Sequence, residues 1–298
     1  MQLARNLLVT FRPEQWIKNL VVFAGLIFAR ELFHPAAVAT AVAAFAIFCV
    51  LSSVVYAVND ILDRDADRRH PLKRLRPIAS GALSPAAALW AAVPLGAIAI
   101  AAAFRVGPQF GLVAASYVAL LGLYSGPLKH IVIIDVLTIA LGFVLRAAGG
   151  AIALAVPISH WLLVCTILLA LFLALSKRRH ELVLLADSAA EHRRILGEYS
   201  PYLLDQMIGV VTASTLIAYT FYTISPDTIE KFGTNRLGLT LPFPLYGIFR
   251  YLYLVHRKEG GGSPAEMLLT DRPLLACVAL WVLAVVLIIY NPLGMRGF

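Results

Sequence analysis

The feature that most constrains this chain is its succession of long apolar runs separated by short basic segments. A helix needs about 20 mainly apolar residues to cross the hydrocarbon core of a bilayer. Lipid offers the backbone no hydrogen-bond partners, so each such run is expected to be helical. The sequence therefore predicts an all-α, polytopic membrane protein with about nine transmembrane helices. The candidate spans are residues 16–33, 36–58, 86–104, 108–124, 131–154, 159–176, 205–224, 240–255 and 273–291.

Composition supports a lipid environment for most of the 298 residues. Hydrophobic residues make up 60% of the chain and charged residues 14%, with a mean hydropathy of +0.81, whereas soluble domains carry about a quarter charged residues. The net charge of +8 could suggest a nucleic-acid partner. However, the basic residues fall between the apolar runs, where the orientation of membrane proteins explains them, so no nucleic-acid partner is predicted.

The distribution of basic residues predicts how the chain is oriented in the membrane. With nine spans, 18 of the 25 Lys and Arg residues fall on the side of the N-terminus and five on the other side. The basic side faces the cytoplasm. We therefore predict a multi-pass protein of a bacterial plasma membrane, with residues 1–298 forming one transmembrane domain. Its cytosolic, active-site loops would lie near 59–85, 125–130 and 177–204.

The most informative motif follows the second span and reads Asn59-Asp60-Ile61-Leu62-Asp63-Arg64-Asp65-Ala66-Asp67. At 3.6 residues per turn, Asp60, Asp63 and Asp67 share one stripe of a continuous helix, and Asp65 points away. Like charges at this spacing repel one another. The sequence offers no nearby arrangement that neutralises all three carboxylates, whereas a divalent cation would do so.

Six basic residues close to the motif suggest that phosphate shares such a metal site. Carboxylate oxygens suit Mg²⁺, which is commonly shared with the phosphates of a substrate, and Lys and Arg would take the remaining phosphate charge. A solvated, charged loop that obeys the orientation rule is the simpler explanation, but it does not account for the spacing of the acids. These bases are Arg64, Arg68, Arg69, Lys73, Arg74 and Arg76.

The pattern N-D-x-x-D-x-x-x-D after the second of nine spans resembles the first aspartate-rich motif of the UbiA-type intramembrane prenyltransferase superfamily. The resemblance implies a UbiA-like helical bundle that binds the diphosphate of its donor through Mg²⁺ at these acids. Most members carry a second acid pair, D-x-x-x-D, after the sixth span. Here that loop opens with Lys177-Arg178-Arg179-His180-Glu181, and only Asp187 and Glu191 could form a degenerate pair. A second metal site therefore stays open.

Further segments resemble the branch of this superfamily that transfers phosphoribosyl to decaprenyl phosphate. They are residues 12–19, 73–81, 124–130, 142–147 and 177–181. The resemblance implies a Mg²⁺-dependent transferase of cell wall biogenesis with two phosphorylated partners. Phosphoribosyl diphosphate would supply the diphosphate leaving group, and a polyprenyl phosphate would be the nucleophile. One metal cluster with several separate bases suits three phosphate groups.

This resemblance assigns roles to individual residues, as a hypothesis. Asp60, Asp63 and Asp67 would hold Mg²⁺ on the diphosphate, and Lys73 and Arg74 would bind phosphate beside them. Arg146 lies within a predicted span, where charged residues are usually functional; it either reaches the cavity or pairs with an unidentified acid, and Asp135 is about three turns too far away. The substrate-binding residues would be Lys18, Asn19, Asn59, Tyr124, Lys129, Arg146, Lys177, Arg178 and Glu181.

Two other functions are compatible with the sequence. One is an ordinary UbiA-type prenyltransferase that moves an isoprenoid from its diphosphate to an aromatic acceptor. The other is a carrier of lipid phosphate without catalysis, although transporters usually concentrate polar groups near the bilayer midplane. Which base meets which phosphate, the length of the lipid, the downstream pathway and whether the chain forms a homo-oligomer are left open by the sequence.

Overall fold

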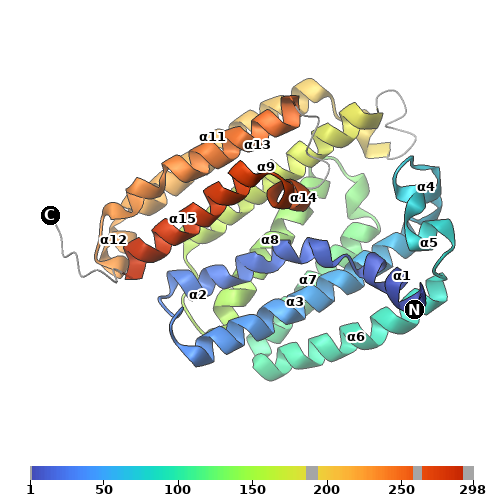
Figure 1. Ribbon diagram of the computed structural model, residues 1–298, viewed down its shortest axis with the longest axis horizontal. Coiled ribbons are helices and arrows are strands. Elements are labelled where there is room, and N and C mark those ends of the chain that lie inside the picture. The colour runs from blue at the N-terminus through green and yellow to red at the C-terminus, as the bar shows by residue number, and fades with distance from the viewer. Residues whose placement is uncertain (1, 186–193, 258–263, 291–298) are drawn as a thin grey trace.

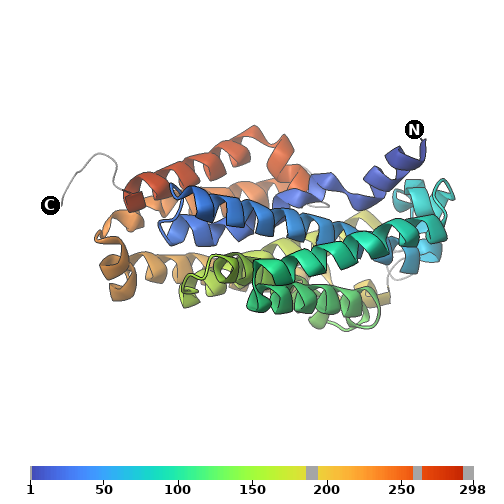
Figure 2. The same cartoon turned by 90° about the horizontal axis from the view of Figure 1, so that it is seen from below.

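The computed structural model describes residues 2–185, 194–257 and 264–290, and this part of the chain contains helices and no strands. The long helices run side by side along the longest axis of the molecule (Figures 1 and 2). In chain order the elements are α1 (Gln2–Phe11), η1 (Pro13–Phe23), α2 (Ala24–Phe28), α3 (Pro35–Leu62), α4 (Arg64–Arg69), η2 (Lys73–Leu75), α5 (Pro77–Ser80), α6 (Pro85–Val106), α7 (Pro108–Ser125), η3 (Leu128–His130), α8 (Ile134–Ala153), α9 (His160–Leu185), η5 (Arg194–Glu198), α11 (Pro201–Ile224), α12 (Pro226–Phe232), η6 (Arg236–Thr240), α13 (Pro242–Arg257), α14 (Pro264–Thr270) and α15 (Arg272–Tyr290).

Seven helices of the described residues are long and apolar enough to cross a membrane. They are α3, α6, α7, α8, α9, α11 and α15, and each coincides with a predicted span. The prediction of an all-α polytopic protein is therefore confirmed. Several of them begin with a proline, which fits the first turn because its missing N–H has no helical partner there.

The two weakest predicted spans have a different structure. Residues 13–23 form a 3₁₀ helix before the short α2, and α13 has 16 residues. Long 3₁₀ segments are uncommon because their hydrogen bonds are less well aligned than those of an α-helix. Both segments nevertheless run beside the longer helices (Figure 1). The number of nine spans stays a prediction.

Small residues bring η1 and α2 against the last turn of α8. A Cβ added to Gly150 would lie 2.1 Å from the carbonyl oxygen of Val22, and one added to Gly25 would lie 3.0 Å from the Cα of Ala151. Such close backbone approach is typical of helices packed within membranes. This contact fixes η1, and with it Lys18, between α3 and α8.

The outer surface of the bundle is apolar. On α6, for example, the side chains of Trp90, Val93 and Ile98 are exposed. Because a soluble protein rarely exposes large continuous apolar surface, these side chains are those expected to face lipid. Together with the seven long helices, they show a multi-pass membrane protein.

Candidate functional site

A cavity of about 430 Å³ opens between the helices at the end of the bundle where α4 and the N-terminus lie (Figure 1). Its wall is divided into a charged part and an apolar part. Side chains from η1, α3, α7, α8 and α9 enter it, and α14 covers one side. The apolar part includes Ile17, Val21, Val55, Leu121, Ile139, Phe143, Leu169 and Leu173.

Basic side chains dominate the charged part of the cavity. Eight Lys and Arg residues and two carboxylates line it among the described residues. The carboxylates are Asp63 and Glu181. The basic residues are Arg12, Lys18, Lys73, Arg76, Lys129, Arg146, Lys177 and Arg178. A cavity with this excess of positive charge is suited to bind several anionic groups.

The aspartate motif lies across a helix end rather than along one helix. Asn59 and Asp60 belong to the last turns of α3, which ends at Leu62, and α4 begins at Arg64. Asp63 forms the turn between them, with φ −89° and ψ 4°. The expectation of one continuous helical stripe is therefore wrong, because the helix is interrupted within the motif.

Each of the three acids has a basic partner, and for Asp60 and Asp63 one such partner comes from a distant part of the chain. Asp60 is only 2% exposed and binds Arg12 as well as Arg76, whose Nη1 lies 3.1 Å from its Oδ1. The same Nη1 of Arg76 lies 2.6 Å from Oδ2 of Asp67. The sequence predicted no nearby arrangement that neutralises all three acids. In the structure one base is nearby, Arg76, and two distant bases, Arg12 and Lys129, complete the pairing.

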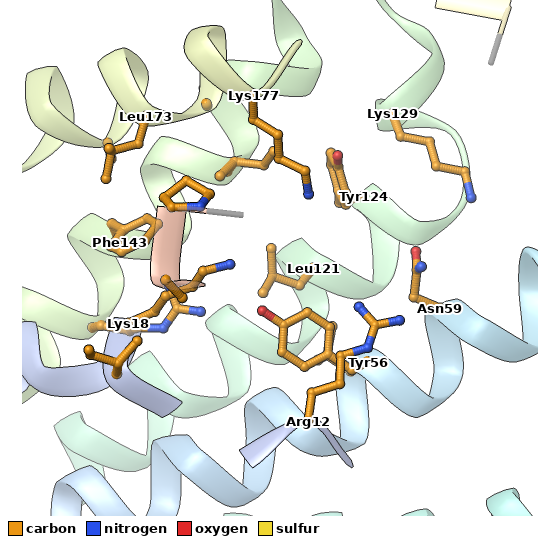
Figure 3. Close-up of a pocket in the computed structure, with 18 of the residues that line it drawn as sticks. Arg12, Lys18, Tyr56, Asn59, Leu121, Tyr124, Lys129, Phe143, Leu173 and Lys177 are labelled. Atoms are coloured by element: carbon orange, nitrogen blue, oxygen red, sulfur yellow. The ribbon is translucent and has the colours of Figure 1, made fainter. Parts of the chain in front are cut away.

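Asp63 is the motif carboxylate that lines the cavity. It forms an ion pair with Lys129 of η3 and accepts a hydrogen bond of 3.0 Å from the Asn59 amide. Figure 3 shows Lys129 and Asn59 on the same side of the cavity. Burial raises the pKa of Asp67 above its ordinary value, although Arg76 opposes the shift.

The donor set suits Mg²⁺ in its chemistry, and each of the three acids is paired with a base. Among residues 2–185, 194–257 and 264–290, no three His, Cys, Asp or Glu side chains stand close enough together to hold a metal. Asp60 and Asp67 do converge on a single cationic nitrogen, that of Arg76. Mg²⁺ prefers such oxygen ligands, so the acids fit the ion once they are released from their bases.

A second group of basic residues lies on the opposite side of the cavity. Lys18 from η1 and Lys177 from α9 point toward the same space in Figure 3. Lys177 lies within electrostatic range of Lys18, Lys73 and Arg178, and its nearest recorded acid is Glu181 at 4.0 Å. Mutual repulsion of these cations favours an anion between them.

Arg146 lies in the middle of α8 and lines the cavity, which is one of the two alternatives that the sequence left open. Its Nη2 donates a hydrogen bond of 2.6 Å to the hydroxyl of Tyr117, and its guanidinium lies over the Tyr117 and Phe143 rings. No carboxylate of the described residues forms an ion pair with it. A buried charge at this depth is costly unless it serves a ligand.

Arg178 is enclosed by acids and differs from the other bases. It is 1% exposed, and its Nε lies 2.9 Å from Oδ2 of Asp135; it also binds Glu181 and, at 3.1 Å, the hydroxyl of Tyr124. The Tyr199 hydroxyl donates to Asp135 at 2.9 Å and accepts from the Ile133 N–H at 2.8 Å. Burial raises the pKa of Tyr199 to about 12. These contacts hold Arg178 in place.

Four of the residues assigned from the sequence do not line the cavity. Asp60 and Asp67 lie beneath it, against Arg76. Arg74 is exposed on η2, and Arg76 takes the cavity position beside it. Asn19 is fully buried against Cys49 and Ser52 of α3, 3.3 Å from each, because adjacent residues of a helix point in different directions and Lys18 takes the cavity side. Asp187 and Glu191 lie outside the described residues.

The individual role assignments from the sequence left out Arg12, Tyr56 and Arg76, which also line the cavity. Arg76 was only one of the six bases noted near the motif. Arg12 had one recognisable signal, since it precedes Pro13, and a residue before proline disfavours the ordinary helical conformation. It adopts φ 51° and ψ 62°, which turns the chain between α1 and η1. A positive φ in a residue other than glycine often marks a functional site.

Comparisons with known proteins place the chain among membrane transferases. The UbiA prenyltransferase family matches residues 19–270. The chain therefore belongs to the UbiA prenyltransferase family and is a transferase.

Two relatives narrow the comparison. The chain is 32% identical to the decaprenyl-phosphate phosphoribosyltransferase of Corynebacterium glutamicum, over 97% of this chain and 88% of the relative. It is 31% identical to the protein of the same name from Mycolicibacterium smegmatis, over 94% and 91%. A UbiA homologue from Archaeoglobus fulgidus, solved with GPP and Mg²⁺, has the same fold, with a TM-score of 0.74 and 18% identity over 96% of this chain and 99% of that one.

Proposed function

We propose that the chain transfers the 5-phosphoribosyl group from phosphoribosyl diphosphate to a polyprenyl phosphate, such as decaprenyl phosphate, with Mg²⁺ bound. The observation that carries the proposal is the charge of the cavity, in which eight basic residues face two carboxylates beside an apolar wall. The two substrates together bring one diphosphate, two monophosphates and one long hydrocarbon chain. The full-length similarity to two phosphoribosyltransferases supports the same reaction.

The two basic groups suggest where each substrate binds. The diphosphate would bind at the aspartate motif with Arg12, Arg76 and Lys129, and Mg²⁺ held there by Asp60, Asp63 and Asp67 would neutralise charge on the leaving group. Lys18, Lys73, Arg146 and Lys177 would bind the 5-phosphate and the lipid phosphate. The isoprenoid chain would follow the apolar wall between Val21 and Leu173.

The reaction needs positioning and charge stabilisation more than proton transfer. An oxygen of the lipid phosphate forms the new bond to the anomeric carbon, and the bond from that carbon to the diphosphate oxygen breaks. The lipid phosphate is already anionic near neutral pH, so no strong general base is required. Fixed cations at the diphosphate stabilise the charge that develops as it leaves, while Arg178, held by Asp135 and Glu181, keeps the neighbouring wall rigid.

The proposal is tested by comparing two donors on one membrane preparation. Membranes containing the chain receive Mg²⁺ and either labelled phosphoribosyl diphosphate with polyprenyl phosphate, or labelled geranyl diphosphate with an aromatic acid. We expect label in the organic extract only with the first pair. If geranyl diphosphate is consumed and phosphoribosyl diphosphate is not, the chain is a UbiA-type prenyltransferase that acts on an aromatic acceptor. If vesicles take up a substrate and no product forms, the chain is a carrier.

The orientation in a bacterial plasma membrane, with the cavity open to the cytoplasm, is part of the same proposal. Lys73, Lys129 and Lys177 come from three segments that were predicted to be cytosolic, and all three line one cavity. Reporter fusions after residues 106 and 190 are expected to report opposite sides of the membrane. Both reporters on one side would contradict this orientation.

A further inference from the structure

The aspartate motif and its bases form one cluster of ion pairs. Asp60, Asp63 and Asp67 are matched by Arg12, Arg76 and Lys129. All three bases line the cavity, but only one of the three acids does. In this structure the acids and the bases therefore satisfy one another, and neither set is free to bind a ligand.

Arg76 stands at the centre of this cluster. Its Nη1 contacts Asp60 of α3 and Asp67 of α4, at 3.1 Å and 2.6 Å. One cationic atom thus holds together carboxylates from both sides of the helix interruption at Asp63. A metal ion bound by the same two acids would need the place that this nitrogen occupies, because like-charged carboxylates converge only around positive charge.

We propose that Arg76 is an internal substitute for the metal ion and is exchanged when metal and diphosphate bind together. Asp60 and Asp67 then release Arg76 and bind the ion. Arg76, Arg12 and Lys129 bind the diphosphate oxygens instead. The inference rests on the part of the proposed function that concerns metal and diphosphate. It does not depend on which group is transferred.

Charge balance explains why the exchange requires both ligands. Mg²⁺ alone would add two positive charges to a largely buried cluster and would separate Arg76 from the two carboxylates that it contacts, which is costly at low dielectric. Diphosphate alone would meet bases that are already paired. When both bind, each released charge gains an opposite partner, so each ligand strengthens the binding of the other by the same factor.

The first test uses the full chain, purified in detergent, and calorimetric titration. Mg²⁺ and sodium diphosphate are titrated separately, and then each is titrated in the presence of the other. We expect each ligand to bind about 5- to 150-fold more tightly when the other is present. Equal affinity for Mg²⁺ with and without diphosphate would overturn the proposal, and this result needs no variant.

The second test removes the internal cation. In Arg76→Gln we expect the affinity for Mg²⁺ alone to rise by about tenfold or more. The further increase in Mg²⁺ affinity that diphosphate causes should become smaller. A purely structural role of Arg76 would not raise metal affinity. Arg69→Gln is the matched control because Arg69 is exposed on α4 and has no ion pair among the described residues. Arg76→Lys keeps the charge and should behave more like the unchanged protein.

Thermal unfolding checks that Arg76→Gln is folded. If it is not, Lys129→Gln makes the same test at Asp63. Unchanged or weaker binding of Mg²⁺ alone in a folded Arg76→Gln or Lys129→Gln variant would contradict the exchange. If Mg²⁺ and diphosphate strengthen each other's binding as expected but no phosphoribosyl is transferred, only the proposed reaction is contradicted.

Discussion

The two ends of the charged wall use the same residue types in opposite ways. At the aspartate motif, acids are paired with bases that also face the cavity: the side chains of Arg12 and Arg76 are 18% and 26% exposed. At the α8–α9 end, Arg178 is enclosed by Asp135 and Glu181 and further held by Tyr124. The first group can change partners when a ligand enters, whereas the second cannot without leaving buried charge unpaired.

This difference separates residues that bind from residues that position. A base that reaches the cavity and has an exchangeable partner is available to phosphate. A base surrounded by acids serves mainly to hold the elements that carry the others, here α7, α8 and α9. The sequence assigned Arg178 to substrate binding, and this stays a prediction. Because acids surround its guanidinium, we propose that it also positions these helices.

The largest expected effect concerns the exchangeable end. Asp63→Ala removes the motif carboxylate that lines the cavity, and we expect phosphoribosyl transfer to fall by more than about a hundredfold, since even supporting residues of a metal site cost 10- to 100-fold. Asp60→Ala should have a similar effect. The measurement is labelled lipid formed per unit of chain in membranes.

Asp65→Ala is the matched control for this experiment. Asp65 belongs to the same motif, but its side chain is 89% exposed and its ion pair with Arg68 is 3.7 Å long. We expect it to keep near-normal activity. Full activity of folded Asp60→Ala and Asp63→Ala variants would show that the motif holds no catalytic metal.

Much of this architecture could be predicted from the sequence because the bilayer imposes one rule on every span. Seven spans were placed within a few residues of their helices, apart from α9, which continues to Leu185 instead of ending near 176. That extension carries Lys177 and Arg178 on a helix rather than on a loop. Polar residues at the water boundary continue a helix as readily as they end it, so hydropathy does not locate such an end.

Two of the ion pairs of the acids could not be predicted, because they are contacts between distant segments. Arg12 and Asp60 are 48 residues apart, and Lys129 and Asp63 are 66 apart. Spacing within the motif indicates which acids can act together, but it does not indicate which bases meet them. Sequence spacing also could not distinguish Arg74 from Arg76, since both follow the motif closely. Only the packing of the folded chain leaves Arg74 exposed and places Arg76 in the wall of the cavity.

At the α8–α9 end, loss of the buried base Arg178 is expected to lower the stability of the fold. Arg178→Gln removes the buried cation that contacts both Asp135 and Glu181, and breaking a buried pair in this way costs about 3–5 kcal/mol. We expect a clearly lower Tm in detergent, with activity reduced in proportion to the folded fraction. Arg76→Gln, at the exchangeable end, should lower the Tm less. Equal losses for the two variants would remove the distinction between the two ends.

A smaller effect is expected at the hydroxyl that supports Asp135. Tyr199→Phe removes a donor to Asp135 and an acceptor for the Ile133 N–H, and leaving buried polar groups unpaired costs about 1–3 kcal/mol. Ile133 has a φ of 69°, which is unfavourable for a β-branched residue, so this hydrogen bond helps to hold a strained turn next to η3. Thermal unfolding should show a lower Tm, and a Tm unchanged from that of the parent chain would mean that Ile133 is held by other contacts.

The smallest effect comes from an ion pair outside the cavity, which gives a reference for both ends. Asp271 accepts hydrogen bonds of 3.1 and 2.8 Å from Arg250, which hold the pKa of Asp271 below its ordinary value. Its Oδ1 also accepts from the Leu274 N–H at the start of α15.

Asp271→Asn keeps this helix cap, because Asn caps as well as Asp, and removes only the charge. A lowered pKa means that the ion pair stabilises the fold above the ordinary Asp pKa of about 3.9 and that this contribution disappears as pH falls below it. The Tm difference between the parent chain and Asp271→Asn should therefore be small at pH 7 and shrink as the pH falls below about 3.9. A difference that grew on acidification would mean that the carboxylate opposes folding at neutral pH, contrary to its contacts with Arg250.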